Sequence, residues 1–265
     1  MSDASSKQQV AAAGASRPRL SVPWNIVLGL VFIAVVFYGA QIVSGLLLSV
    51  YASLRHFSGQ QATDWLNSST GAQFVFILIA EVLTVGAVYL FLRQYKRGWA
   101  AIGLKRPRWY HPLFGLGAIP LYYLLFTILA YAAALIFPSL NVTQKQELGF
   151  DHVVGQSQLV YTFISLVILP PIAEEIVFRG FIYTTLRKSL TIPIAALITS
   201  VLFGAGHLAE GGSSGPLYIG ALQTFSLSLV LIGLRELTGN LWAGIVLHAS
   251  NNLIAFLYLF VLHVH

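Results

Sequence analysis

The sequence predicts an all-α fold, a polytopic transmembrane bundle of about seven helices, with six or eight spans as alternatives. Composition is the first reason: 57% of the 265 residues are hydrophobic and only 9% are charged, whereas soluble domains contain about 25% charged residues. The second reason is that apolar runs recur along the chain, each roughly 20 residues long, which is the length that crosses a bilayer. We therefore expect one transmembrane helical domain over residues 24–265.

Residues 1–23 precede the first apolar run and are rich in Ala, Ser and Gln. They lack the apolar centre of a signal peptide, so we expect a disordered cytoplasmic tail. No internal repeat divides the residues that follow. In chain order, the expected spans are 24–54, 71–93, 112–137, 158–187, 193–212, 216–238 and 240–262.

Basic residues between the expected spans predict the orientation of the chain. Six Lys and Arg residues lie in the loop 93–108, and cytoplasmic loops are enriched in such residues. With a cytoplasmic N-terminus, this loop and the turns at Arg187 and Arg235 all fall on the cytoplasmic side. We therefore expect a multi-pass protein of the plasma membrane, and we assign the net charge of +6 to topology and not to nucleic-acid binding.

The fourth expected span, 158–187, is longer than a bilayer requires, and Pro170 and Pro171 interrupt it. A proline has no backbone donor, so we expect a bend and carbonyl groups without their helical partners. Two interpretations stay open. Either the freed carbonyls line a local polar pocket, or the prolines only shape a kink that helps packing.

Three ionisable residues follow the prolines within this apolar span, namely Glu174, Glu175 and Arg179. Ionisable groups at membrane depth cost several kcal/mol, and they are usually paired or functional. Glu175 and Arg179 are four residues apart, which is the spacing of an ion pair on one helix face. Glu174 points about 100° away from that pair. We interpret the Glu175–Arg179 pair as a brace and Glu174 as a general base that acts on water.

Polar residues on two later spans reach a comparable depth. Counting about 1.5 Å per residue from the cytoplasmic ends places Glu174, His207 and Asn252 at roughly 18 to 21 Å. His248 comes out about one turn shallower, on the same helix face as Asn252. A carboxylate, a histidine beside it and a His/Asn pair suit water activation and oxyanion stabilisation. The alternative is that each residue is a separate polar group that holds helices together.

Three motifs follow in order on successive spans: Glu-Glu-x-x-x-Arg at 174–179, Phe-x-x-x-His at 203–207 and His-x-x-x-Asn at 248–252. In these motifs the chain resembles the CPBP family of CAAX proteases and bacteriocin-processing enzymes, which includes the Ras-converting CAAX endopeptidase. The resemblance covers about 158–256, the expected catalytic core, and it implies an intramembrane endopeptidase.

The resemblance also implies roles for individual residues. Glu174 would activate water with His207, while His248 and Asn252 would form the oxyanion hole. The supporting residues would be Glu175, Arg179 and Phe203, the last of which would pack near the site. One difference is that the eukaryotic-type enzyme has eight spans, whereas seven are expected here, which would leave the C-terminus outside.

Metal binding is an open question, because the family is often called a metalloprotease. The chain has no cysteine and no His-Glu-x-x-His motif, so thiolate ligands and a one-helix zinc site are excluded. We expect no cofactor, with zinc held by Glu174, His207 and His248 as the alternative.

Two further features of the sequence resemble functional groups. The Gly-Ser-Ser-Gly string at 212–215 is similar to a rhomboid serine-protease motif, but it lies in a glycine-rich loop and would leave both glutamates unexplained. Glu81 lies in the middle of the second expected span. It is expected to be a structural residue or a group that lines the site cavity.

Together these residues predict an intramembrane endopeptidase. The expected substrate is a membrane-embedded or lipidated protein or peptide, for which the resemblance supplies prenylated CAAX-type proteins as the precedent. The lipid bilayer is the other expected partner. The alternative class is a non-proteolytic transporter or scaffold that retains the motif residues as structure. Transporters often contain internal repeats, and none is visible in this sequence.

Overall fold

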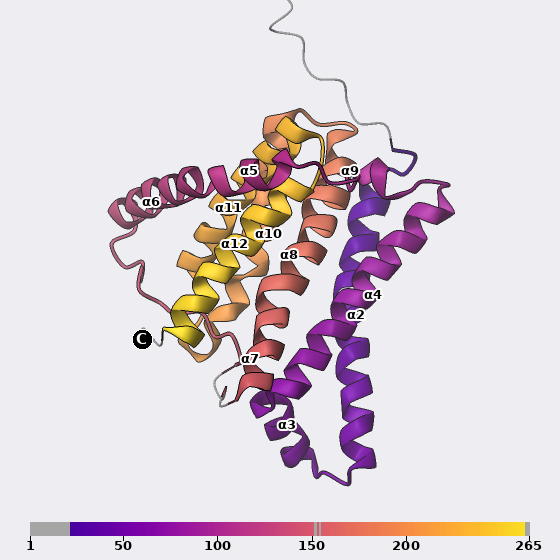
Figure 1. The fold of residues 1–265 in the computed structure, drawn as a ribbon, viewed down its shortest axis with the longest axis vertical. Coiled ribbons are helices and arrows are strands. Elements are labelled where there is room, and N and C mark those ends of the chain that lie inside the picture. Colours follow the sequence, from indigo (N-terminus) through magenta and orange to yellow (C-terminus); the bar gives the residue numbers. More distant parts are fainter. Residues whose placement is uncertain (1–21, 151–152, 154, 263–265) are drawn as a thin grey trace, which may run out of the picture.

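The computed structural model describes residues 22–150, 153 and 155–262, and this part of the chain is helical and contains no strand (Figure 1). Seven of the described helices are long and apolar enough to cross a membrane. The predicted all-α class and the predicted number of spans are therefore confirmed. Residues 1–21 of the predicted tail lie outside the described residues.

The first three spans precede the predicted catalytic core. The first two are α2 (Ile26–Leu54) and α4 (Thr70–Gln94), with the short helix α3 (Gly59–Ser68) between them. A 3-10 turn at Trp99–Ile102 follows. The third span consists of α5 (Tyr110–Gly117) and α6 (Ile119–Ile136). Ala118 alone separates the last two helices, so they are read together as one span.

The fourth span, Gln156–Arg187, alternates between α-helix and π-helix. In chain order its segments are α7 (Gln156–Phe163), a π-helix at Ile164–Ile168, α8 (Leu169–Glu174), a π-helix at Glu175–Ile182 and α9 (Tyr183–Arg187). π-Helical turns are rare and are found mostly at functional sites. Here the first π-helix ends just before the proline pair, and the second begins at Glu175, within the glutamate pair.

The last three spans complete the predicted core. They are α10 (Ile192–Gly206) with a 3-10 turn at Leu208–Ser214, α11 (Tyr218–Thr238), and α12 (Trp242–Phe256) with a π-helical turn at Leu257–Val261. The predicted bounds of all seven spans differ from the observed bounds by at most two residues. Helix ends fray by this amount, so the difference carries no meaning.

The helices form two groups around the fourth span. α2 packs on α4 on one side, and α10, α11 and α12 pack together on the other. Between them, α8 contacts both α4 and α12. In Figure 1, α5 and α6 run across the other helices near the end where α9 finishes. The third span is also the least buried of the seven.

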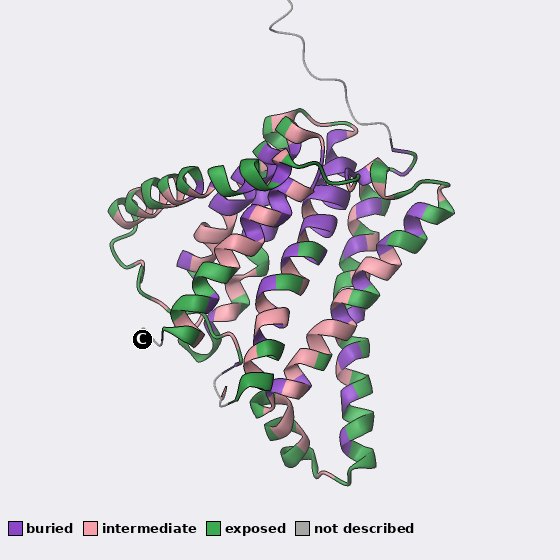
Figure 2. Ribbon diagram, in the orientation of Figure 1, coloured by how far each residue is buried: buried purple, intermediate pink, exposed green. Residues whose placement is uncertain are grey.

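Burial is uneven, as expected for a protein whose outer surface faces lipid. Figure 2 shows buried residues concentrated around α9 and the neighbouring ends of α11 and α12, whereas α6 and much of α2 are exposed. The exposed residues on α2 include large apolar side chains, among them Val31, Val35 and Leu46. In water such faces would be unfavourable, but hydrocarbon is as apolar as these side chains.

Packing at the α9 end begins before the first span. Trp24 is fully buried, and its Nε1 donates a hydrogen bond of 2.8 Å to the hydroxyl of Thr185. Its ring packs against Phe91 and Phe181 with centroids 5.3 and 5.4 Å away. Lys188 Nζ donates to the carbonyl oxygen of Trp24 at 2.7 Å. Trp24, which precedes α2 in the chain, is thus attached to the end of the fourth span, and these contacts hold α9 in place.

Candidate active site

The glutamate pair lies where α8 passes into the second π-helix. Glu174 is the last residue of α8, and Glu175 is the first residue of the π-helix. Glu175 is buried and forms an ion pair with the buried Arg179, with 3.0 Å between Oε1 and Nη1. The ion pair expected from the four-residue spacing is therefore present. Glu174 is less buried than Glu175 and faces the same helix, α12.

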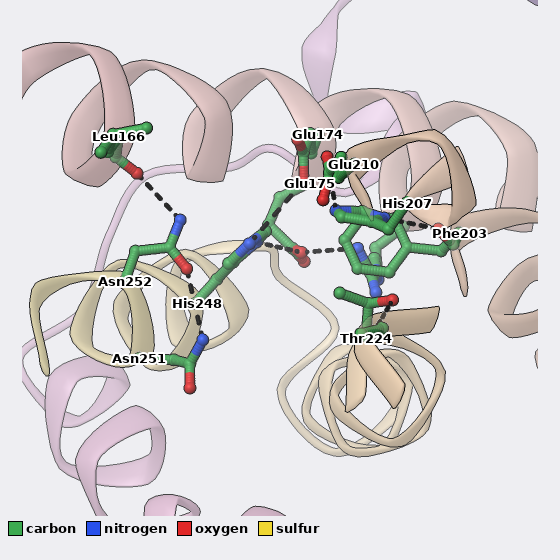
Figure 3. Close-up of polar contacts among 12 residues, drawn as sticks. Leu166, Glu174, Glu175, Phe203, His207, Glu210, Thr224, His248, Asn251 and Asn252 are labelled. Atoms are coloured by element: carbon green, nitrogen blue, oxygen red, sulfur yellow. Dashed lines mark hydrogen bonds and ion pairs between the residues drawn. The ribbon is translucent and has the colours of Figure 1, made fainter. Parts of the chain in front are cut away.

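His248 of α12 lies between the two glutamates (Figure 3). Its Nδ1 is 3.4 Å from Oε1 of Glu175, and its Nε2 is 3.7 Å from Oε2 of Glu174. The sequence predicted His248 about one turn shallower than Glu174, and the two side chains nevertheless lie in contact between α12 and the fourth span.

Gly244 allows α12 to approach the glutamates this closely. It precedes His248 by one turn, and a Cβ atom at this position would lie 2.8 Å from Oε2 of Glu175. Real Cβ contacts are longer than this, so any larger residue would push the carboxylate or the helix away. The distance between His248 and Glu175 thus depends on a residue without a side chain.

His207 lies at the end of α10, on another side of the site. Its Nδ1 is 2.8 Å from the carbonyl oxygen of Phe203, and its Nε2 is 4.0 Å from Oε1 of Glu210. Within the described residues, no hydrogen bond or ion pair joins His207 to Glu174. The two residues that are expected to activate water together are therefore not in direct contact. The histidine that directly faces Glu174 is His248.

Phe203 occupies the space between the two histidines and the arginine. Its ring centroid is 4.8 Å from that of His207 and 5.9 Å from that of His248. The guanidinium carbon of Arg179 lies over the ring, 4.1 Å from the centroid, as in a cation–π contact. The residue expected to pack near the site thus contacts three of its polar members.

Asn252 is attached to the carbonyl group that the prolines leave without a partner. Its Nδ2 donates a hydrogen bond of 2.9 Å to the oxygen of Leu166. In an α-helix this oxygen would accept from residue 170, and in a π-helix from residue 171. Both are prolines and have no N–H group. Of the two interpretations of the proline pair, the structure favours the one in which a freed carbonyl serves a polar site.

Two residues that the sequence did not single out extend this contact. Asn251 donates from Nδ2 to Oδ1 of Asn252 at 3.3 Å, and the hydroxyl of Tyr123 in α6 donates to Oδ1 of Asn251 at 3.3 Å. The chain of hydrogen bonds thus connects α6, α12 and the fourth span. The adjacent pair of asparagines in an apolar helix was the signal available in the sequence.

Several buried polar atoms at the site have no hydrogen-bond partner within the described residues. They are both carboxylate oxygens of Glu175, the three guanidinium nitrogens of Arg179 and Nδ1 of His248. Buried polar groups are usually satisfied, and exceptions often mark catalytic sites. These atoms interact by charge alone, which leaves their hydrogen-bonding capacity for other groups.

The charges that act on Glu174 come from Glu81, Arg179, Glu210 and Glu175. Only Arg179 among these is a cation, and Glu175 already forms an ion pair with it. Arg179 is thus engaged by Glu175, and the carboxylate of Glu174, which faces His248, is the group available for proton transfer.

A cavity of about 590 Å³ lies between α4 and α8 and reaches the residue before Glu174. It is lined by Glu81, Val82, Val85, Gly86, Tyr89, Trp99, Leu169, Ile172 and Ala173. The lining is apolar apart from Glu81 and the tyrosine hydroxyl. The volume falls in the range of small-molecule and cofactor sites. Of the two expectations for Glu81, the structure favours a group that lines the site cavity.

The structure does not assemble the alternative zinc site. No group of three His, Asp or Glu side chains in the described part of the chain is arranged to hold a metal ion. Of the three expected donors, Glu174 and His248 lie 3.7 Å apart, whereas His207 faces Glu210. Within the described residues, no hydrogen bond joins a histidine to Ser214, the serine of the Gly-x-Ser-Gly pattern, and the neighbouring Ser213 contacts Glu147.

Seven apolar helices around a buried cluster of carboxylates and a histidine define a multi-pass membrane protein with the groups of a hydrolase. Residues 156–254 match the family model described as Type II CAAX prenyl endopeptidase Rce1-like. The predicted resemblance to the CAAX proteases is confirmed over this segment. Comparison with the curated proteins found no significant match, and comparison with the solved structures found none either.

Proposed function

We propose that the protein is an intramembrane endopeptidase that hydrolyses a peptide bond of a lipidated or membrane-embedded substrate with water activated by Glu174. The observation that carries this proposal is the position of His248, which lies between Glu174 and Glu175 inside the segment that matches the Rce1-like family. A scaffold does not require a carboxylate to face an imidazole in this way, and the matching family is described as endopeptidases.

Glu174 is the proposed general base. It takes a proton from water as the water oxygen bonds to the scissile carbonyl carbon, and it returns that proton to the amine nitrogen as the C–N bond breaks. Glu175 has a different role in this proposal. It holds Arg179 through the ion pair, and its negative charge beside Nδ1 orients the ring of His248.

The oxyanion is proposed to form between α12 and α10. His248 presents Nε2 toward Glu174, and a proton on this atom would be donated to the oxyanion. Asn252 uses one N–H group on Leu166, and the second N–H group of its amide is left for the oxyanion. His207 assists from the α10 side of the site, where the ring of Phe203 lies between it and His248.

The cavity between α4 and α8 supports a substrate that is partly apolar. It lies beside Glu174, and nearly all of its lining atoms are apolar. A lipid chain or the side chains of a membrane-embedded segment have the chemistry that fits it. Prenylated CAAX-type proteins are the proposed substrates, because the matching family is described as prenyl endopeptidases.

A plasma-membrane location with the N-terminus in the cytoplasm completes the proposal. The basic ends expected in the cytoplasm lie at one end of the bundle, because Arg187 Nε is 3.9 Å from Oε1 of Glu236 and Nδ2 of Asn240 donates to the carbonyl oxygen of Arg106 at 3.1 Å. A shared basic end is the pattern of the positive-inside rule.

The experiment that tests the proposal measures cleavage by the purified protein in liposomes. A farnesylated peptide with a fluorophore and a quencher on either side of the expected scissile bond serves as the substrate. We expect the wild-type protein to release fluorescence and Glu174→Gln to be slower by about 10²- to 10⁴-fold, the contribution of a general base.

Asp64→Asn supplies the matched control, because Asp64 is an exposed carboxylate in α3, far from the site in sequence and structure. It should cleave at the wild-type rate. Cleavage that survives in Glu174→Gln would remove Glu174 from the role of base. Cleavage of the same peptide without its farnesyl group at an equal rate would contradict the proposed lipidated substrate but leave the peptidase intact.

A further inference from the structure

A second cavity, of about 470 Å³, lies at the end of α4 and is surrounded by positive charge. Its lining consists of Tyr89, Arg93, Lys96, Arg97 and Gly98. Three of these five residues are cations and none is an acid. The cavity lies outside the glutamate and histidine cluster and outside the segment that matches the Rce1-like family.

The three cations have no acidic partner among the described residues. Arg93 donates from Nη1 to the hydroxyl of Tyr89 at 3.3 Å and lies over that ring, 5.9 Å from its centroid. Neither Lys96 nor Arg97 forms an ion pair within the described part of the chain. A cavity lined by unpaired cations is complementary to an anion.

The backbone of Lys96 has a conformation that favours glycine. Its φ angle is +53°, and it occupies the position after the helix cap in a Schellman motif. Two hydrogen bonds define the motif, from Arg97 N to the oxygen of Leu92 at 2.8 Å and from Lys96 N to that of Arg93 at 2.9 Å. A lysine at this position is strained, and strain of this kind tends to persist at functional sites. The turn places Lys96 and Arg97 around the same cavity as Arg93.

The basic cavity continues into the apolar cavity described above. Tyr89 lines both of them, and Trp99 of the apolar cavity stacks on Tyr89 with centroids 5.5 Å apart. Val85, Tyr89 and Arg93 are each four residues apart, so they share one face of α4. Along this face the positively charged Arg93 comes at the end of the helix, the aromatic Tyr89 follows, and the aliphatic Val85 lies toward the membrane interior.

We propose that this groove binds one anionic phospholipid, with its phosphate among Arg93, Lys96 and Arg97 and an acyl chain in the apolar cavity past Trp99. An amphiphile with an anionic head group matches both halves of the groove, whereas a soluble anion would use only the basic half. Basic pockets at the cytoplasmic ends of transmembrane helices are known to bind such head groups. The site is independent of the proposed peptidase reaction.

Quenching of tryptophan fluorescence by brominated lipids tests this assignment. The full-length protein is placed in nanodiscs of phosphatidylcholine with a small fraction of phosphatidylglycerol or phosphatidylcholine that carries bromine on its acyl chains. We expect stronger quenching by brominated phosphatidylglycerol. Substitution of Trp99 by Phe should remove most of this difference, because the bound chain lies beside that ring.

The combined variant Arg93→Gln, Lys96→Gln and Arg97→Gln should lose the preference for phosphatidylglycerol. Each basic residue near the surface contributes about fivefold to such binding, so the loss expected for three residues is on the order of 100-fold. The matched control carries Lys105→Gln, Arg106→Gln and Arg108→Gln, three exposed cations of the same loop. This control should retain the preference. An equal loss in both variants, or a preference that survives in the first, would overturn the site.

Lys96→Gly separates the proposed role from a structural one. Glycine relieves the strained φ angle and removes one charge, so we expect a higher unfolding temperature together with weaker quenching by brominated phosphatidylglycerol. A variant that is more stable and binds the lipid as well as the wild type would exclude Lys96 from the site.

Discussion

Glu174 and Glu175 are adjacent in sequence but differ in what surrounds them. Glu175 is buried, contacts Arg179 and His248, and lies against Gly244. Glu174 is less buried and faces only the Nε2 side of His248. The difference arises because successive residues of a helix point about 100° apart. One carboxylate thus belongs to the interior of the bundle, and the other lies at its edge beside the apolar cavity.

This difference predicts opposite effects of two conservative substitutions. Glu175→Gln leaves Arg179 buried without its partner, which typically costs about 3–5 kcal/mol of stability. Glu174→Gln removes a proton acceptor without exposing a buried charge, so its stability should change by less than about 1 kcal/mol while cleavage is lost. Reversible unfolding in mixed micelles of detergent and SDS, measured for both variants, decides the comparison. A more stable Glu175→Gln variant would show that the ion pair is not a brace.

Gly244 provides a second prediction at the residue scale. Gly244→Ala would place a Cβ atom 2.8 Å from Oε2 of Glu175. We expect a loss of about 1–3 kcal/mol from overpacking, together with reduced cleavage, because His248 is displaced from both glutamates. Gly233 of α11 is the matched control, since a Cβ atom there meets nothing within 4 Å. Gly233→Ala should be neutral or slightly stabilising, as helix propensity predicts.

At the scale of elements, the shape of the fourth span follows from two missing backbone N–H donors. Pro170 and Pro171 remove both donors that the oxygen of Leu166 would find in an α- or a π-helix. Asn252 supplies the missing donor from α12. The kink, the π-helical turns and the attachment of α12 are therefore one feature, and Asn252 contributes to the fold as well as to the proposed oxyanion site.

A double-mutant cycle between these elements tests that dependence. Asn252→Ala should cost about 1–3 kcal/mol in the wild-type background, because the oxygen of Leu166 loses its partner. In the background of Pro170→Ala and Pro171→Ala, a backbone N–H can take that place, so the same substitution should cost less. We expect a coupling of about 0.5–3 kcal/mol from unfolding measurements on the four proteins. Additive effects would mean that Asn252 and the prolines act independently.

The sequence predicted where the spans lie better than it predicted which residues on different spans are in contact. All seven spans could be located because apolar runs of bilayer length need only composition to be found. The contact of His248 with both glutamates could not be predicted, because it depends on how α12 packs against the fourth span. The pairing of His207 with Glu210 also depends on tertiary contacts, in particular on Gln146, whose Nε2 donates to Oε2 of Glu210 at 2.7 Å. The motifs identified which residues form the site, and the packing of the helices decided which of them face each other.

At the scale of the whole molecule, the orientation of the third span is the critical point for topology. α5 and α6 have the length and composition of a span, yet they run across the other helices in Figure 1. The loop that follows then leads to α7 at the opposite end of the molecule from α9 (Figure 1). If α6 crosses the bilayer, the residues after it lie on the side opposite the basic loop 93–108.

Single cysteines can decide this because the natural chain contains none. Gln60, Ser139 and Arg106 are exposed positions in α3, after α6 and in the basic loop, respectively. With a membrane-impermeant maleimide on intact cells, we expect labelling of Gln60→Cys and Ser139→Cys. Arg106→Cys should react only after the membrane is permeabilised, because the positive-inside rule places its loop in the cytoplasm. Labelling of Ser139→Cys and Arg106→Cys from the same side would mean that α6 lies along the membrane surface, and six spans would then replace seven.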